Sequence, residues 1–88
     1  MNEYMYYQRE ILLECMRNII AKISRYSIAL SKDSPKTPEK YIEYLREANR
    51  LKREILFCNT SEQLDALSFK IDKYKEIATT LEVIANGI

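Results

Sequence analysis

Residues 61–87 read SEQLDALSFKIDKYKEIATTLEVIANG, and this stretch decides the fold. Its apolar residues recur at alternating steps of three and four: Leu64, Leu67, Ile71, Tyr74, Ala78, Leu81 and Ala85. A period near 3.5 residues places these side chains in one stripe along a helix. Thr60 and Gln63 fit a capping box at the start, and Gly87 sits at the C′ position, where glycine commonly ends a helix.

Two earlier segments carry the same spacing. The first stripe is Met5, Leu12, Met16, Ile19, Ile23, Tyr26 and Leu30, and the second is Tyr41, Tyr44, Ala48, Leu51, Ile55 and Cys58. Pro35 interrupts the chain between them, and Thr37 followed by Pro38 is typical of a helix start. We therefore predict helices over about 2–32, 38–58 and 61–86.

These three segments predict one all-α domain over residues 1–88. Short connections make successive helices antiparallel neighbours. The expected architecture is an antiparallel up-down-up three-helix bundle with coiled-coil-like packing and a long, overhanging first helix. A chain of 88 residues has a small core, and small domains often gain stability from a partner chain.

The overhang follows from the register of the first hairpin. If the chain turns near residue 36, Cys58 at the end of the second helix lies level with Glu14. About twelve residues, 2–13, then lack a partner in the second helix and span about 18 Å. The third helix, starting near Ser61 and running back along the bundle, is not expected to cover them. The alternatives are a different register, or residues 1–8 that fold back or fray.

This end is rich in tyrosine, methionine and aliphatic side chains, which are typical of protein interfaces. We expect it to bind a protein partner or a second copy of the chain. The candidate partner-binding residues are Tyr4, Met5, Tyr7 and Ile11.

Composition argues against several other classes. The 14 basic and 13 acidic residues give a net charge of +1, whereas nucleic-acid binders usually carry a basic excess. Histidine, the commonest general base and transition-metal ligand, is absent. We find no phosphate-binding loop and no nucleophile–base set, so we expect neither enzyme activity nor a cofactor or metal.

No apolar run approaches a membrane span, and residues 1–10 do not resemble a secretory signal, so we expect a cytoplasmic protein.

A second surface is indicated by the residues outside the three stripes. Arg46, Arg50 and Arg53 recur at steps of four and three, and Phe69 lies off the stripe of its helix, as does Val83. The arginines are open to three interpretations: an ordinary solvated face, a site for an acidic protein partner, or a nucleic-acid contact. Phe69 and Val83 either extend an interface or are ordinary exposed side chains.

The two cysteines also have two interpretations. Cys15 and Cys58 fall level in the predicted hairpin, so a disulfide is sterically conceivable. Two reduced thiols acting as small apolar side chains are the expected state in a cytosolic protein.

The string Ser61-Glu62-Gln63-Leu64-Asp65 is similar to the Ser-Gln-Glu-Leu-Asp motif of the sporulation-control aspartyl-phosphate phosphatases, with the central Glu and Gln transposed. Those proteins are helical hairpins that dephosphorylate a response regulator. The resemblance covers about seven residues, and it would place Gln63 and Asp65 at the polar positions of the motif. The long first helix departs from that family's plan.

The function expected from the sequence is a non-enzymatic protein-interaction module of chaperone, inhibitor or adaptor type, binding its partner through an apolar and aromatic helix surface. The alternative is a structural homo-oligomer, most simply a homodimer. Further alternatives are nucleic-acid binding through the arginines and the phosphatase activity that the resemblance implies.

Overall fold

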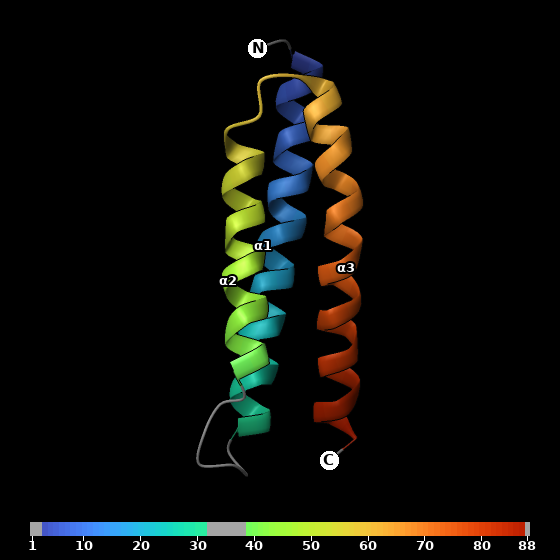
Figure 1. Ribbon diagram of the computed structural model, residues 1–88. Coiled ribbons are helices and arrows are strands. Elements are labelled where there is room, and N and C mark those ends of the chain that lie inside the picture. The colour runs from blue at the N-terminus through green and yellow to red at the C-terminus, as the bar shows by residue number, and fades with distance from the viewer. Residues whose placement is uncertain (1–2, 32–38, 88) are drawn as a thin grey trace.

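The computed structural model describes residues 3–31 and 39–87 (Figure 1). Three helices make up this part of the chain: α1 Glu3–Ser31, α2 Glu39–Leu56 and α3 Ser61–Asn86. Successive helices run in opposite directions and pack side by side, which confirms the predicted all-α three-helix bundle. The predicted start signal at Thr37 and Pro38 lies outside the described residues.

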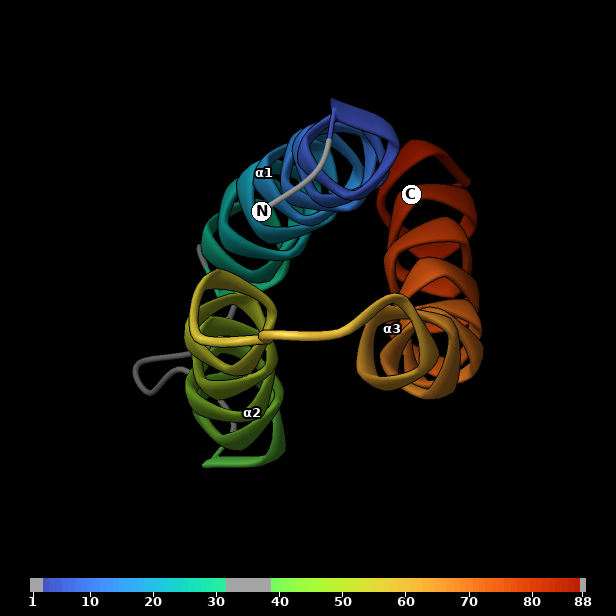
Figure 2. The same cartoon turned by 90° about the horizontal axis from the view of Figure 1, so that it is seen from above.

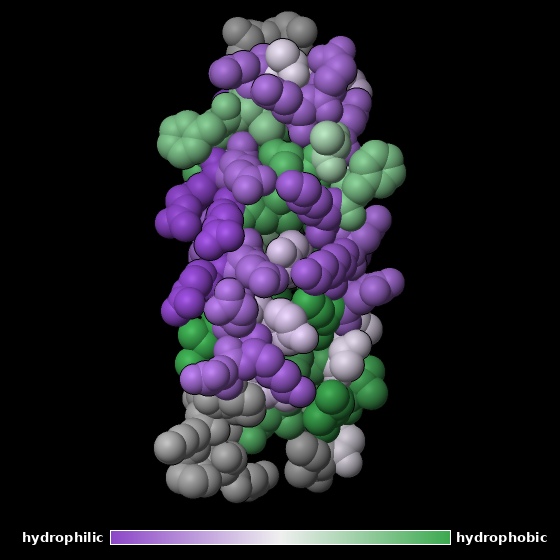
Figure 3. Space-filling view, viewed as in Figure 1, coloured by the Kyte–Doolittle hydropathy of each residue, from purple (hydrophilic) through white to green (hydrophobic). Residues whose placement is uncertain are grey.

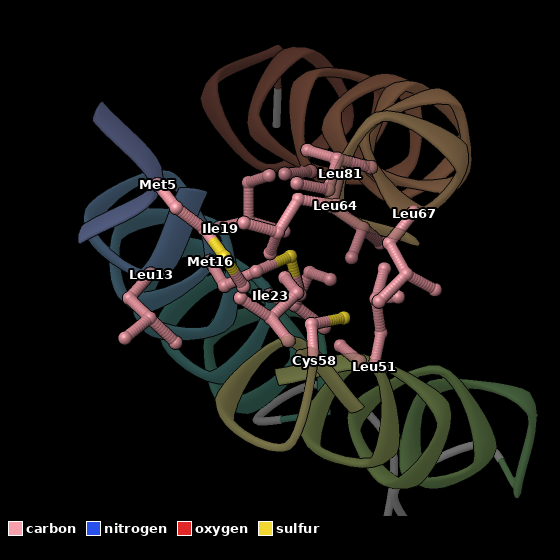
Figure 4. Packing of buried hydrophobic residues seen from close by; sticks show 14 residues of the cluster. Met5, Leu13, Met16, Ile19, Ile23, Leu51, Cys58, Leu64, Leu67 and Leu81 are labelled. Atoms are coloured by element: carbon pink, nitrogen blue, oxygen red, sulfur yellow. The ribbon is translucent and has the colours of Figure 1, made fainter. Parts of the chain in front are cut away.

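The long helix α1 packs against both other helices (Figure 2). Met16 and Ile23 of α1, Ile55 of α2 and Leu64 of α3 are the largest fully buried side chains. Figure 4 shows Met16, Ile23 and Leu64 converging in the space between the three ribbons. One helix therefore supplies the core surface for both of its neighbours.

The predicted stripes face this core. Their buried members are Met5, Met16, Ile19, Ile23, Ala48, Leu51, Ile55, Cys58, Leu64, Leu67, Ile71, Ala78 and Leu81. The predicted tyrosines Tyr26, Tyr41, Tyr44 and Tyr74 are partly buried against them. Leu13 and Ser27 are also buried, although neither belongs to the predicted stripe of α1. A helix with neighbours on two sides buries a wider arc than one stripe describes.

The capping box at the start of α3 is confirmed. The backbone N–H of Gln63 donates to Thr60 Oγ1 at 3.2 Å, and Gln63 Oε1 accepts from the backbone N–H of Thr60 at 3.3 Å. Gly87 follows the last residue of α3 as predicted, but its φ of −83° lies in the right-handed region. Its N–H donates to the Val83 carbonyl at 3.0 Å, so the backbone keeps its helical course and no left-handed cap forms.

More of the N-terminal end of α1 is covered by other parts of the chain than the predicted hairpin register implies. Figure 1 shows its first turn projecting past the connection between α2 and α3. Just below that turn, Gln8 Nε2 donates to Asp65 at 2.6 Å, Ser61 Oγ donates to Gln8 Oε1 at 2.8 Å, and Arg9 donates to the Cys58 carbonyl. The expectation that the third helix leaves this end uncovered is therefore wrong. The predicted register considered only the hairpin between α1 and α2. Residues 57–60, which connect α2 to α3, carry the chain past the end of α2 to the level of Gln8.

The fold makes a direct prediction about stability. Leu64→Ala removes a fully buried side chain and should lower the free energy of unfolding by about 2–5 kcal/mol. Phe69→Ala is the control, because Phe69 is 77% exposed and its loss should change stability by less than about 0.5 kcal/mol. Urea denaturation followed by circular dichroism measures both. Equal effects of the two substitutions would contradict the packing described here.

Candidate protein-interaction surfaces

Three exposed side chains form a surface at the N-terminal end of α1, which we call the tyrosine face: Tyr4, Tyr7 and Ile11. Their exposed fractions are 69%, 56% and 64%. Steps of three and four residues bring them to one side of the helix. The Tyr7 ring also makes an edge contact with Tyr6, with 5.6 Å between ring centroids. The structure therefore places three of the four predicted partner-binding residues together.

Met5, the fourth predicted residue, does not belong to this surface. It is only 5% exposed and joins the core cluster. Met5 follows Tyr4 by one position, which turns its side chain about 100° around the helix axis toward α2 and α3. Met5 therefore anchors the helix end, and its assignment to an exposed interface is corrected.

A groove runs between α2 and α3 on the side away from α1. Figure 2 shows the connection between these helices spanning the gap, and Figure 3 shows apolar side chains in a furrow between polar rims. We call this hollow the α2–α3 groove. Its residues from α2 and the connection are Lys40, Tyr41, Tyr44, Glu47, Arg50, Leu51, Arg53, Glu54, Phe57 and Cys58. Those from α3 are Gln63, Ala66, Leu67, Lys70, Lys73, Tyr74, Glu76, Ile77, Thr80, Leu81 and Ile84.

Polar side chains bridge the middle of the groove. Lys70 lies 3.8 Å from Glu54, and Lys73 lies 3.7 Å from Glu47. The Tyr74 hydroxyl donates to Glu47 Oε2 at 3.3 Å. Burial, together with the negative charge of Glu47 and the hydrogen bond to it, raises the pKa of Tyr74 above its ordinary value of 10.0.

The arginines predicted as one stripe have different surroundings. Arg46 lies 3.3 Å from Glu43 on the same helix, as on an ordinary solvated face. Arg50 and Arg53 line the end of the groove next to Phe57. Phe69, the other residue predicted for this secondary surface, is exposed but does not line the groove. Sequence reasoning missed the groove itself, because its residues belong to stripes or rims of two separate helices.

The two cysteines are free thiols in different places. Cys15 lies in a hollow between α1 and α3, beside Lys22 and Lys75, whereas Cys58 is buried at the end of the α2–α3 groove. Burial raises the pKa of the Cys58 thiol above its ordinary 9.0, against a smaller lowering by the positive charge of Arg9. The structure therefore matches the expectation of reduced thiols over the alternative of a disulfide.

The two polar residues of the string that resembles the phosphatase motif have structural partners. Gln63 belongs to the capping box, where its Oε1 also accepts from the backbone N–H of Asn59 at 2.8 Å. Asp65 accepts the hydrogen bond from Gln8 that ties α3 to α1. Both side chains thus serve contacts that the sequence comparison did not anticipate.

Comparisons with known proteins add no assignment to these surfaces. The chain matches no family model, no curated protein and no solved structure. Within residues 3–31 and 39–87, no three acidic or cysteine side chains are grouped so that they could hold a metal ion. None of the described helices is both long and apolar enough to cross a bilayer. The tyrosine face and the groove are therefore the features from which a function can be inferred.

The raised pKa of Tyr74 predicts a loss of stability in alkaline solution. Above about pH 10 the unfolded chain releases this proton while the folded chain retains it, so the free energy of unfolding falls as pH rises. Tyr74→Phe should make this fall shallower between about pH 9 and 11. Urea denaturation at several pH values measures the slope. An identical slope for the wild type and Tyr74→Phe would refute the raised pKa of Tyr74.

Proposed function

We propose that this chain is a protein-interaction module without catalytic activity of its own, and that its tyrosine face inserts into an apolar cleft of a partner protein. The observation that carries the proposal is the joint exposure of Tyr4, Tyr7 and Ile11 on one side of a helix end. Tyrosine is enriched among the residues that dominate binding energy, because its ring buries a large area at modest entropic cost. Anchors at steps of three and four are the usual pattern of a helix that docks into a groove.

The contacts behind the tyrosine face support this proposal. Met5 is buried in the core, Gln8 is bonded to Ser61 and Asp65, and Arg9 is bonded to the Cys58 carbonyl. These contacts hold the helix end in place, so that the backbone that carries the tyrosine face is already helical before a partner arrives. Preorganisation of this kind reduces the entropic cost of binding.

Self-association through the same face is the second candidate. The net charge of +1 gives little electrostatic repulsion between copies, and a two-fold contact is the commonest symmetric arrangement. In this case the tyrosine face of one copy would pack against that of another. Light scattering at several concentrations separates this candidate from binding to a different protein.

The proposal predicts that partner binding depends on the tyrosine face. A chain carrying Tyr4→Ser, Tyr7→Ser and Ile11→Ser together should lose at least about tenfold in affinity, since truncation of a hot-spot residue costs about 2 kcal/mol or more and about 1.4 kcal/mol is a tenfold change. The measurement is affinity capture from the producing cells, with mass spectrometry of the retained proteins and circular dichroism to confirm folding.

Ile28→Ser provides the matched control. Ile28 is also an exposed aliphatic residue of α1, and it lies 17 residues beyond Ile11, or about 26 Å along the helix. The Ile28→Ser chain should capture the same proteins as the wild type. If the triple variant also retained them in equal amounts, the tyrosine face would not be the binding surface.

A further inference from the structure

We propose that the α2–α3 groove is a second binding site, and that it accepts an acidic amphipathic helix of a partner protein. This inference is independent of the tyrosine face, because no residue of α1 lines the groove. Its support comes from the two apolar ends of the groove, the distance between them and the charge along its rims.

The groove has two apolar hollows separated by a polar middle. The hollow at the connection has a volume of about 590 Å³ and is lined by Phe57, Ala66 and Leu67. The opposite hollow has a volume of about 360 Å³ and includes Ile77 and Leu81. Such hollows accept aliphatic or aromatic side chains of a docked helix.

The separation of the hollows suits a helix lying along the groove. Leu67 and Leu81 are 14 residues apart on α3, which corresponds to about 21 Å along the helix axis. Two anchors separated by two heptads on a partner helix span the same length and face the same side. A helix in this position would contact both α2 and α3 and complete a four-helix arrangement with α1 on the far side.

The charges along the rims favour an acidic partner. The basic lining residues are Lys40, Arg50, Arg53, Lys70 and Lys73, and the acidic ones are Glu47, Glu54 and Glu76. Lys70 and Lys73 pair with Glu54 and Glu47 across the groove. Among the described residues, Arg50 and Arg53 form no ion pair within the chain, and both flank the larger apolar hollow. The excess positive charge complements carboxylates on the rim of a partner helix, and it disfavours the same groove of a second copy.

The test uses two synthetic helical peptides of 21 residues with blocked termini. Both carry leucine at heptad positions a and d, and they differ only in having glutamate or lysine at e and g. Fluorescence anisotropy with the full chain should show at least tenfold tighter binding of the glutamate peptide. Arg50→Glu with Arg53→Glu should abolish or reverse this preference, whereas the matched control Arg25→Glu, on α1, should preserve it. Equal binding of the two peptides, or no binding of either, would overturn the proposal.

A further variant separates insertion into the groove from adsorption by charge alone. Ala66 is exposed at the larger hollow, so Ala66→Arg should fill the groove without disturbing the core. This substitution should weaken the binding of the glutamate peptide at least tenfold, although it adds a positive charge. Unchanged or tighter binding would refute docking in the groove.

Two further readouts keep this inference distinct from the proposed function. The Tyr4→Ser, Tyr7→Ser, Ile11→Ser chain should bind the glutamate peptide as the wild type does. If Ala66→Arg instead converted a wild-type dimer into a monomer in light scattering, the occupant would be a second copy, and the acidic-partner proposal would be wrong.

Discussion

The structure depends on a single constraint, which is that α1 packs against both α2 and α3. Met16 and Ile23 on this helix have no exposed surface, because side chains from both neighbours enclose them. Since α1 supplies the core surface for both, α2 and α3 do not have to close against each other on the far side. The α2–α3 groove is therefore a consequence of the same packing that holds the fold together.

The length of α1 has a second consequence. The helix continues past the end of α2, where the connection and the first turn of α3 contact it through Gln8 and Arg9. These polar contacts and the buried Met5 hold the final turns in place. Tyr4, Tyr7 and Ile11 then project from a supported helix, so a structural role for the inner side of this end is compatible with a binding role for its outer side.

Much of the fold could be predicted from the sequence because its signals are local. The alternating steps of three and four define one stripe per helix, and the Thr60–Gln63 capping box places the start of α3. Whether the N-terminal end of α1, including the stripe residue Met5, is covered could not be predicted in the same way. It depends on the path of residues 57–60 and on partners about 50 residues away, such as Cys58 for Arg9. The register of the α1–α2 hairpin does not determine where the connection between α2 and α3 places the start of α3.

The two surfaces differ in how much of each could be predicted from the sequence. The tyrosine face lies within one helix, so composition and spacing selected Tyr4, Tyr7 and Ile11, but they also selected Met5, which the fold buries. The groove lies between two helices, and its width is set by how each of them packs on α1. The sequence predicts Arg50 and Arg53 as part of a charged stripe, but only the fold separates them from Arg46 and places them beside Phe57 and Leu67.

The three-helix core closes without Tyr4, Tyr7 and Ile11, and we propose that this exposed tyrosine face is covered by a partner. Hydroxyl-radical footprinting of the isolated chain and of its captured complex tests this claim most directly. We expect rapid modification of Tyr4 and Tyr7 in the isolated chain, strong protection of both in the complex, and no change at Ile28. Protection of the tyrosines in the isolated monomer, or equal modification in both samples, would contradict it.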